Sequence, residues 1–371
     1  MNEKTYKVLQ VFASLNVGGA ETRMMDVYRN LDKSLINFDF VTMNSLNDFY
    51  CKEILDAGGN VFLVSNPRKS KFTKFRKELK KILLENNYDA IHVHTSYFSG
   101  FVCAIAFECK VKIRITHSRT TSSKNQSLKS KCQIFIGKKL IRVFSNRYIS
   151  ISKSAAVFLF GKKMVKKGKV KVINNAIDLK RFYQIDFIDE KLLQEINNHI
   201  VITHVGRFSN MKNHNFIIDV FFEFLKINSN SKLILVGIGE EMDRIRNKVK
   251  ELGISNSVIF LGVRKDICFI LRNSNIFIFP SFFEGLGGAI IEAQACGIPC
   301  LISDLIPEEV DVNMNLIKRL SLNQSASEWA NELNMLKYSK INNFDYIEKK
   351  LIENKYVVEE EIKELLDIYF S

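Results

Sequence analysis

Short apolar runs and amphipathic stretches alternate along most of the chain. In the first half, runs of strand length rich in Val, Ile and Phe are followed by stretches whose apolar residues recur every three to four positions, as on the buried side of a helix. This order predicts a parallel sheet, because a helix must return the chain before each new parallel strand. The expected strands are 7–14, 38–43, 60–64, 89–94 and 112–116, and the expected helices are 21–31, 50–57 and 72–84.

The pattern loosens over residues 178–198, which we interpret as a linker, and then starts again. The second set comprises strands at 200–206, 232–237, 258–261, 276–280 and 299–303, and helices at 215–226, 240–252 and 288–296. A chain of 371 residues is also too long for one hydrophobic core. We therefore predict an α/β protein with two Rossmann-like domains, 1–185 and 199–350, facing a central cleft. A C-terminal helix within 351–371 is expected to pack back toward the N-terminal domain.

The composition narrows the class of protein. Hydrophobic residues make up 46% and charged residues 25% of the chain, as in ordinary globular domains. No stretch approaches the roughly 18 apolar residues of a membrane-spanning helix. The apolar run 8–15 ends in Asn16-Val17-Gly18-Gly19, so it does not have the form of a signal peptide. The seven cysteines form no C-x-x-C pair, which is typical of a reducing compartment, and we expect a cytoplasmic protein.

The net charge of +14 is concentrated in the first half of the chain. Residues 1–178 hold 32 Lys and Arg against 13 Asp and Glu, and residues 179–371 hold 22 against 27. Between Cys109 and Ile177 there is no acidic residue. This asymmetry predicts an anionic partner for the N-terminal half, which could be a membrane surface, a nucleic acid or a phosphorylated acceptor.

The segment with the strongest functional signature is 279–293, Phe-Pro-Ser-Phe-Phe-Glu-Gly-Leu-Gly-Gly-Ala-Ile-Ile-Glu-Ala. It combines the end of a strand, a loop with Glu284 and three glycines, and the start of a helix near Gly288. Glycines let the backbone approach a ligand, and the free N–H groups of a helix start favour phosphate. Glu292, about one turn into the helix, would repel phosphate but suits a neutral diol such as a ribose.

A second motif, Gly206-Arg207-Phe208-Ser209-Asn210-Met211-Lys212-Asn213, follows the first strand of the second half. Arg207 and Lys212 leave the carboxyl end of that strand, where open α/β sheets bind ligands. Two cations there can neutralise a diphosphate leaving group. The turn Gly18-Gly19-Ala20-Glu21 occupies the corresponding place in the first half, although a Gly-Gly turn alone predicts little.

Together these segments resemble the retaining glycosyltransferases of the GT-B fold in family four, which includes sucrose and polysaccharide transferases. The resemblance covers nearly the whole chain, from G-G-x-E and a strand ending His-x-His to G-R-x-x-x-K-N and E-G-x-G with E-x7-E. Glu292-Ala293-Gln294-Ala295-Cys296-Gly297-Ile298-Pro299-Cys300 is similar to the E-A-Q-x-x-G-x-P-C pattern of bacterial exopolysaccharide and capsule enzymes. One departure is Gly288-Ala289, where many relatives have Leu-Pro or a similar pair, so the donor sugar stays unassigned.

The resemblance implies a role for each matching residue of the second half. Arg207 and Lys212 would bind the donor diphosphate, and Glu292 would bind the ribose hydroxyls. Glu284 would contact hydroxyls of the donor sugar. The backbone of the following loop would help it, through Gly285, Leu286, Gly287 and Gly288.

In the first half, the resemblance places Gly18 and Gly19 against the donor phosphate and His117 at the reaction centre. The residues expected to act on the reacting groups are His117, Arg207, Lys212 and Glu284. No D-x-D triplet occurs, so we expect neither a metal nor a cofactor, with the nucleotide-sugar as substrate. The strand-end pair His92 and His94 resembles a pair of metal ligands. Such pairs are more often structural, so we expect no metal there.

Three other functions are consistent with parts of the sequence. A dehydrogenase would share the Rossmann-like halves but lacks G-x-G-x-x-G. A sugar-nucleotide 2-epimerase would use the same two-domain scaffold, since fold does not fix function. A basic nucleic-acid-binding protein would need aromatic residues interleaved with cations, and the acid-free stretch instead has aliphatic and Phe clusters such as 155–160, so we expect no nucleic acid.

The partners we expect are a nucleotide-sugar, UDP-hexose or UDP-N-acetylhexosamine, a polyprenyl-linked glycan acceptor and an anionic membrane surface. Residues 68–81 hold eight basic residues and one acid, with an apolar stripe of Phe72, Phe75 and Leu79 that we interpret as a shallow membrane contact. Lys162, Lys163, Lys166 and Lys167 beside the apolar run 158–160 add to it. The protein would then lie on the inner face of the cell membrane, in surface polysaccharide synthesis.

Overall fold

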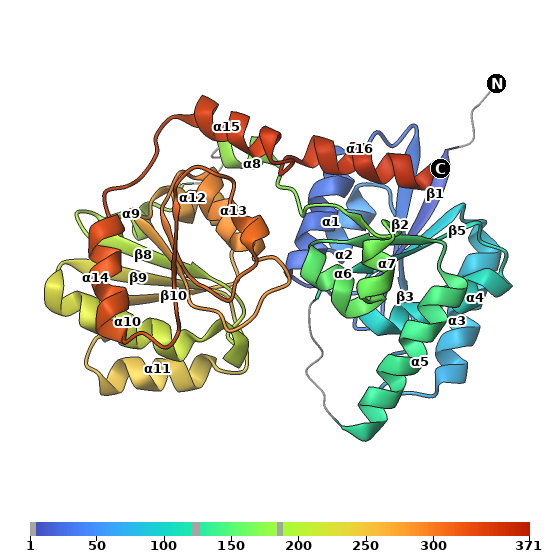
Figure 1. Cartoon of the computed structure of the whole chain (residues 1–371), viewed down its shortest axis with the longest axis horizontal. Helices are drawn as coiled ribbons and strands as arrows, with labels where there is room; N and C mark the ends of the chain where they lie inside the picture. Colours follow the sequence, from blue (N-terminus) through green and yellow to red (C-terminus); the bar gives the residue numbers. More distant parts are fainter. Residues whose placement is uncertain (1–4, 121–126, 184–187) are drawn as a thin grey trace. The chain divides into compact units, whose positions relative to one another are not determined.

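The computed structural model describes residues 5–120, 127–183 and 188–371. The chain divides into two compact units: unit 1 comprises Met1–Ala176 and Val358–Ser371, and unit 2 comprises Ile177–Val357 (Figure 1). Each unit is built on a parallel sheet flanked by helices, which confirms the predicted α/β class with two Rossmann-like domains. The sequence places the domain limits at 185, 199 and 350, whereas the chain passes between the units after Ala176 and again after Val357.

The sheet of unit 1 has seven parallel strands in the order β3-β2-β1-β4-β5-β6-β7. Their bounds are β1 Tyr6–Val11, β2 Ile36–Thr42, β3 Val61–Leu63, β4 Ala90–Val93, β5 Ile113–Ser118, β6 Arg147–Ser150 and β7 Lys171–Val172. The direction in which strands are added reverses between β1 and β4. Ligands of open α/β sheets bind outside the carboxyl ends of the strands at such a reversal.

Unit 2 repeats this order with six parallel strands, β10-β9-β8-β11-β12-β13. Their bounds are β8 Ile200–Val205, β9 Ser231–Val236, β10 Val258–Gly262, β11 Ile276–Phe279, β12 Cys300–Ser303 and β13 Ile317–Leu320. The reversal here lies between β8 and β11, the two strands whose following loops carry the motifs at 206–213 and 280–288.

The helices account for the rest of the regular structure. Unit 1 contains α1 Gly19–Asn30, α2 Cys51–Asp56, α3 Phe72–Asn86, α4 Ser99–Glu108, α5 Leu128–Phe144, α6 Lys153–Phe160, α7 Lys162–Lys166 and α16 Val358–Tyr369. Unit 2 contains α8 Leu179–Tyr183, α9 Glu190–Ile196, α10 His214–Ile227, α11 Met242–Glu251, α12 Ile267–Arg272, α13 Gly288–Ala295, α14 Ala326–Leu336 and α15 Phe344–Glu353. Within the described ranges, no helix is both long and apolar enough to cross a membrane.

Several of these elements differ from what the sequence pattern predicts. Helix α4 carries apolar residues on all sides, because it is covered by both the sheet and α5, and it therefore shows no helical period. The stretch 178–198, which we interpreted as a linker, holds α8 and α9. Asp189 caps α9 by accepting from the Leu192 N–H at 3.0 Å, so a short helix begins where the apolar pattern is weak.

The C-terminal helix α16 belongs to unit 1. Its residues Leu365, Ile368 and Tyr369 are buried in the same apolar cluster as Val8 of β1. The Tyr6 hydroxyl on β1 donates to the Tyr369 carbonyl at 2.6 Å. The last helix of the chain therefore completes the core around the first strand.

The basic helix α3 lies on the core rather than presenting an apolar stripe to solvent. Phe75 and Leu79 are fully buried with the strands of unit 1, and only Phe72 is substantially exposed. The interpretation of Phe72, Phe75 and Leu79 as a membrane contact is therefore wrong, because the sheet needs that face of the helix to cover it. The same holds for Leu159 and Phe160 of the 158–160 run, which are also buried.

Helices α4 and α5 touch backbone to backbone through two glycines. A Cβ on Gly100 would lie 2.4 Å from the Gly137 carbonyl oxygen, and a Cβ on Gly137 would lie 2.3 Å from the Tyr97 carbonyl oxygen. These distances are too short for any side chain. The glycines therefore set how closely α5 lies on unit 1.

We predict that Gly100→Ala and Gly137→Ala each destabilise unit 1 by about 1–3 kcal/mol, because overpacking forces the helices apart and outweighs the roughly 1 kcal/mol that Ala gains in helix propensity. Urea unfolding followed by circular dichroism measures this. Lys139→Ala, at an exposed position of α5, is the control and should stay within about 0.5 kcal/mol of wild type. Glycine variants as stable as the control would show that the close approach is absent.

Candidate functional site

The two motif loops of unit 2 leave adjacent strands and are joined to each other. The loop after β8 and the loop after β11 are linked by the Phe282 N–H, which donates to the Met211 carbonyl at 3.0 Å. The Asn213 side-chain amide donates to the Pro280 carbonyl at 3.2 Å. These bonds hold the residues that follow β8 and β11 in one constellation at the strand-order reversal.

Lys212 and Glu284 form an ion pair at the centre of this constellation. Lys212 Nζ lies 2.7 Å from Glu284 Oε1, and the side chains are only 18% and 13% exposed. The same Nζ lies 4.3 Å from the centroid of the Phe279 ring, at the end of β11. The structure thus brings together the two residues to which the resemblance gives separate tasks. The cation is fixed by a carboxylate and an aromatic face, so it is held in place before a ligand binds.

Glycines keep the space around this pair open. A Cβ on Gly206 would lie 2.8 Å from His204 Nε2 and 3.3 Å from Lys212 Cδ. Gly287 precedes α13 with φ of +103°, a conformation that suits glycine, and its Cβ would lie 3.0 Å from Ile290 Cδ1. Both positions therefore require glycine, one for space beside Lys212 and one for the turn that starts the helix.

The remaining predicted residues of unit 2 are placed around the pair with different exposure. Arg207 is 71% exposed and pairs with Glu240 at 3.1 Å, a partner that the sequence reasoning missed because it follows a different strand, β9. Leu286 is buried, so its side chain packs in the core of unit 2. Any contact of Leu286 with a ligand would therefore be made by its backbone. Gly285, Gly288 and Glu292 are partly exposed, with Glu292 on α13 one turn after Gly288.

Two buried histidines lie directly behind Lys212, and the sequence analysis did not single them out. His204, on β8, donates from Nδ1 to the Ile278 carbonyl at 2.9 Å, since that oxygen can only accept. His214 starts α10 and stacks on Phe208 with ring centroids 4.0 Å apart. Burial, with a smaller effect of Lys212, lowers the pKa of His214 to about 3, and burial lowers the pKa of His204 well below its usual value. Both rings are neutral, and the charge beside them is that of Lys212.

In unit 1 the predicted glycines form the start of α1, after β1. A Cβ on Gly18 would lie 2.5 Å from Glu21 Oε2, whereas Gly19 has open space beside it. Burial raises the pKa of the Glu21 carboxyl to about 7, and the charge of Arg119 opposes that shift. Gly18 therefore leaves room for a carboxylate of its own helix, and Gly19 is the position where a ligand can approach the backbone.

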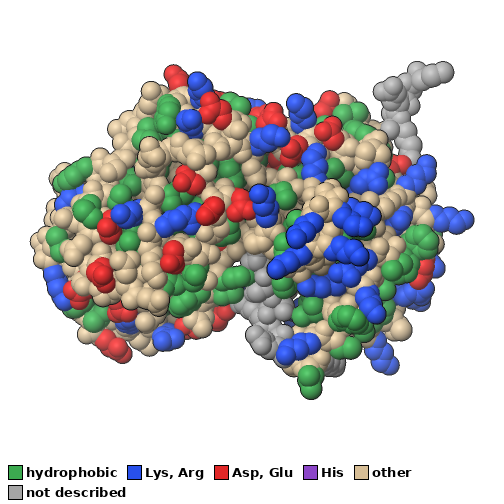
Figure 2. Space-filling model, in the orientation of Figure 1, with side chains coloured by type: hydrophobic (Ala, Val, Ile, Leu, Met, Phe, Trp, Pro, Cys, Tyr) green, Lys and Arg blue, Asp and Glu red, His purple; other side chains and the backbone are tan. Residues whose placement is uncertain are grey.

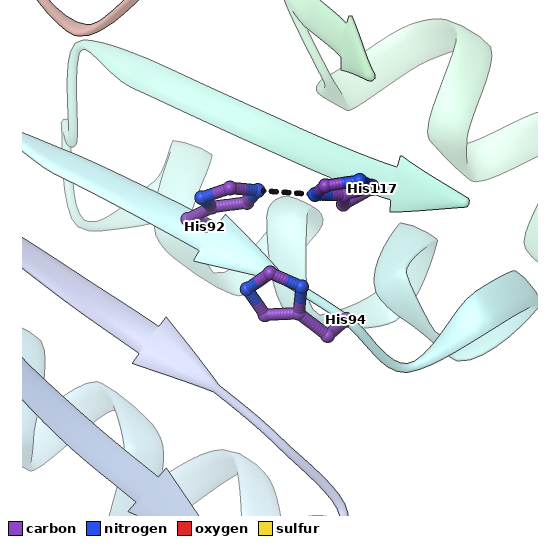
Figure 3. Close-up of side chains that lie close together, drawn as sticks. All are labelled: His92, His94 and His117. Carbon is purple, nitrogen blue, oxygen red and sulfur yellow. Dashed lines mark hydrogen bonds between the residues drawn. The ribbon is translucent and has the colours of Figure 1, made fainter. Parts of the chain in front are cut away.

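His117 lies at the end of β5 in a cluster with His92 of the neighbouring strand β4 and His94 directly after that strand (Figure 3). His92 Nε2 and His117 Nδ1 are 3.1 Å apart. His92 and His117 are buried and His94 is partly exposed. Burial lowers the pKa of all three imidazoles well below the usual value, and the adjacent guanidinium of Arg119 lowers it further. All three are neutral near pH 7.

Nitrogen atoms of these three rings lie within 4.8 Å of one another, a spacing that a metal ion could bridge. The donor set does not fit one. Both nitrogens of His94 are hydrogen-bonded, Nδ1 to Arg119 Nε at 2.9 Å and Nε2 to Gln10 Oε1 at 2.9 Å. His92 is likewise engaged through both nitrogens. A guanidinium in contact with the cluster would also repel a cation.

The buried titratable groups link stability to pH. Five histidines have a lowered pKa, namely His92, His94, His117, His204 and His214. Unfolded, they titrate near pH 6.5, so below that pH the unfolded chain binds protons that the folded protein does not, and the free energy of unfolding falls. Glu21 and Glu361 in unit 1 act oppositely, because their pKa is raised to about 7 and the folded protein binds their protons first.

We predict that unit 2, which has two of these histidines and neither of the two raised carboxyls, loses stability steadily as the pH is lowered from 7 to 5. The chain's single tryptophan, Trp329, is buried in unit 2, so its fluorescence reports the unfolding of that unit in urea. His214→Phe keeps a ring against Phe208. It should reduce the slope of the free energy of unfolding against pH by about 1.4 kcal/mol per pH unit. An unchanged slope in this variant would contradict the assignment of a neutral His214.

Comparison with known proteins agrees with this geometry. Residues 17–181 match the family model described as Glycosyltransferase Family 4, and residues 187–353 match the one described as Glycosyl transferases group 1. EpsF of Bacillus subtilis (strain 168), a glycosyltransferase by name, is 32% identical over 100% of this chain and 97% of its own length. The capsular polysaccharide biosynthesis glycosyltransferase CapH of Staphylococcus aureus is 33% identical over 83% of each chain.

Among solved structures, Anabaena HepE in complex with UDP and glucose superposes with a TM-score of 0.80 at 20% identity, covering 99% of this chain and 100% of that one. This likeness shows the GT-B fold, as the resemblance implied. Both halves of the chain match glycosyltransferase models, and the similarity to EpsF extends over the whole length. The chain therefore belongs to glycosyltransferase family 4, close to the bacterial exopolysaccharide enzymes.

Proposed function

We propose that this glycosyltransferase moves a hexose or N-acetylhexosamine from a UDP-sugar to a lipid-linked glycan during surface polysaccharide synthesis. The observation that carries the donor assignment is the Lys212–Glu284 pair, held at the strand-order reversal of unit 2 beside the start of α13. The HepE structure holds UDP and glucose, and the relative CapH acts in capsular polysaccharide biosynthesis. The first supports UDP as the nucleotide, and the second supports a role in polysaccharide synthesis.

The pair explains how the site can receive a diphosphate. A phosphate oxygen can replace the Glu284 carboxylate as the partner of Lys212, so that one anion is exchanged for another without leaving a partly buried cation alone. Glu284 can then accept hydrogen bonds from hydroxyls of the sugar. Arg207, which is exposed and pairs with Glu240, can turn toward the same phosphates, and Glu292 on α13 would contact the ribose.

For the reaction we propose retention of the anomeric configuration without a metal. The bond between the sugar C1 and the phosphate oxygen breaks, and the acceptor oxygen forms its bond to C1 on the same face. The acceptor proton passes to the departing phosphate oxygen. Lys212, Arg207 and the N–H groups at the start of α13 would stabilise the charge that develops on the diphosphate.

The rival functions have less support. A 2-epimerase would share the fold, but both family matches are to glycosyltransferases. A nucleic-acid-binding role rests on charge alone, whereas both halves of the chain match glycosyltransferase models. We therefore propose no nucleic-acid partner.

A surface of unit 1 suits the membrane that a lipid-linked acceptor requires. Helix α5 exposes one apolar side along its length, formed by Leu128, Cys132, Phe135, Ile136 and Val143. Lys139 lies within this side, with its Nζ 4.6 Å from the centroid of the Phe135 ring, and Lys131 and Arg142 lie exposed next to it. Lys and Arg also gather on the face of unit 1 that carries α6 and α7 (Figure 2), where Lys162, Lys163, Lys166 and Lys167 are exposed.

This arrangement supports an apolar membrane contact on α5 instead of α3. Exposed Phe and Ile side chains can enter the lipid headgroup region while the flanking cations attract anionic lipids, at about 1 kcal/mol for each cation. We propose that unit 1 docks peripherally on the inner face of the cell membrane through α5 and the adjacent basic residues.

Removing the Lys212 ammonium should abolish most of the transfer. Lys212→Ala is expected to lower kcat by roughly 10²-fold, because leaving-group charge is no longer neutralised. Lys226→Ala is the matched control, since Lys226 also pairs with a glutamate at 2.6 Å and lies 4.8 Å over a phenylalanine ring, but on a remote face of unit 2.

The assay follows nucleotide release from UDP-hexoses and UDP-N-acetylhexosamines with and without a polyprenyl-linked acceptor, and NMR of the product records its anomer. We expect a retained anomer, and activity that survives EDTA. Near-normal kcat in Lys212→Ala would show that Lys212 does not stabilise the leaving group. An inverted product would refute the proposed stereochemistry.

For the membrane proposal, we predict that Phe135→Ser/Ile136→Ser lowers binding to phosphatidylglycerol-containing vesicles at least tenfold, because each buried side chain contributes about 1.5–3 kcal/mol. Leu55→Ser/Leu63→Ser is the control, as both residues are about half exposed elsewhere on unit 1. Vesicle co-sedimentation at low and high salt is the measurement. Equal binding by both double variants would exclude α5 as the contact.

A further inference from the structure

A continuous chain of hydrogen bonds connects a partly buried arginine of unit 1 to His117. It passes through residues on or directly after the neighbouring strands β1 and β4, and through the C-terminal helix α16. The residues in order are Arg119, His94, Gln10, Tyr369, His92 and His117. All lie at the reversal of strand order between β1 and β4 or on the elements next to it.

Arg119 sets the donor-to-acceptor direction of this hydrogen-bond chain. Arg119 has only N–H donors, and its Nε donates to His94 Nδ1 at 2.9 Å. Since His94 is neutral, its proton must be on Nε2, which donates to Gln10 Oε1 at 2.9 Å. The Gln10 amide is thereby oriented with Nε2 toward Tyr369, and it donates to the Tyr369 hydroxyl at 3.1 Å.

The remaining hydrogen bonds carry the same donor-to-acceptor direction on to His117. With Gln10 donating to its oxygen, the Tyr369 hydroxyl gives its own proton to His92 Nδ1, 2.7 Å away. The proton of neutral His92 is then on Nε2 and is donated to His117 Nδ1 at 3.1 Å. His117 accepts on Nδ1 and therefore carries its proton on Nε2. Among the described residues, that buried Nε2 has no hydrogen-bond partner.

The Arg119 guanidinium at the start of this hydrogen-bond chain is itself held in place. Arg119 Nη1 donates to Asn175 Oδ1 at 2.8 Å. The buried carboxyl of Glu361 on α16 accepts from the Ala176 N–H at 2.9 Å. Its interaction with Arg119 counters the burial that raises the pKa of Glu361. The helix that supplies Tyr369 thus also supplies the countercharge of Arg119.

We propose that Gln10 and Tyr369 are positioning residues which fix His117 as a neutral imidazole with its proton on Nε2, so that it offers an N–H donor to an oxygen of the bound nucleotide-sugar. The proposal rests on the proposed function for the identity of that ligand. The tautomer itself follows from the hydrogen-bond chain alone. In this arrangement His117 is a donor and cannot act as a base at Nε2.

A change of one atom type in Gln10 tests the direction of the chain. In Gln10→Glu the ionised carboxylate can only accept, so Tyr369 must donate to it. His92 then has to donate from Nδ1, and His117 from its own Nδ1, which leaves His117 Nε2 without a proton. Tyr369→Phe keeps the ring in the core but removes the link. Tyr28→Phe is the control, because Tyr28 is buried in the same apolar cluster and its hydroxyl donates to the Ile54 carbonyl, at 3.5 Å, outside the hydrogen-bond chain.

The readout is the ¹⁵N shift of both imidazole nitrogens of His117, in the full-length protein labelled at histidine and measured at pH 8. We expect protonated Nε2 in wild type and Tyr28→Phe, protonated Nδ1 in Gln10→Glu, and a mixture of the two tautomers in Tyr369→Phe. Protonated Nδ1 in wild type, or protonated Nε2 in Gln10→Glu, would overturn the proposal, and so would an unaltered tautomer in Tyr369→Phe.

Kinetics of the same proteins add the functional consequence. Gln10→Glu and Tyr369→Phe should lower kcat by roughly tenfold, as expected for a lost transition-state hydrogen bond, with donor KM changed less than twofold. Unchanged kcat in Gln10→Glu despite the switched tautomer would overturn the role of the His117 N–H. Absence of any transfer by wild type would instead contradict the proposed function, while the tautomer measurement would still stand.

Discussion

The reversal of strand order in each parallel sheet is the constraint on which the rest of the molecule depends. A parallel sheet needs a helical return after every strand, and where the order of strands reverses, successive returns lie on opposite faces. The loops that follow β8 and β11, and those that follow β1 and β4, are therefore not covered by a crossover helix of their own sheet. Every polar constellation described above is found at one of these two places.

Charge in these places is balanced before any ligand is present. In unit 2, Lys212 is held by Glu284 and by the ring of Phe279, while the histidines behind it stay neutral. In unit 1, the partly buried Arg119 interacts with the carboxyl of Glu361, and its donors orient a row of uncharged side chains. A partly buried charge with a ready partner costs less than a bare one, and the partner can later be exchanged for a substrate anion. The folded protein can thus hold the cation without a ligand and still release it to one.

The sequence predicted the parts of this arrangement that depend on local order. Strands, return helices and the motif loops follow from apolar period and glycine placement, and so Lys212, Glu284 and the glycines around them could be named. It did not predict that Lys212 and Glu284 would pair, because 72 positions separate them and only the sheet order makes their loops neighbours. Tyr369 and Gln10 were missed for the same reason. Helix α3 was misread because a basic amphipathic helix has the same pattern whether its apolar side covers a sheet or a membrane.

We propose that a diphosphate replaces Glu284 as the partner of Lys212 at the strand-order reversal of unit 2. A crystal structure of the protein with UDP bound would decide this. We expect diphosphate oxygens within hydrogen-bond distance of Lys212 Nζ and of the N–H groups at the start of α13, with Glu284 Oε1 no longer 2.7 Å from Nζ. UDP bound with the Lys212–Glu284 pair intact and its phosphates away from β8 and β11 would show that the diphosphate does not displace Glu284.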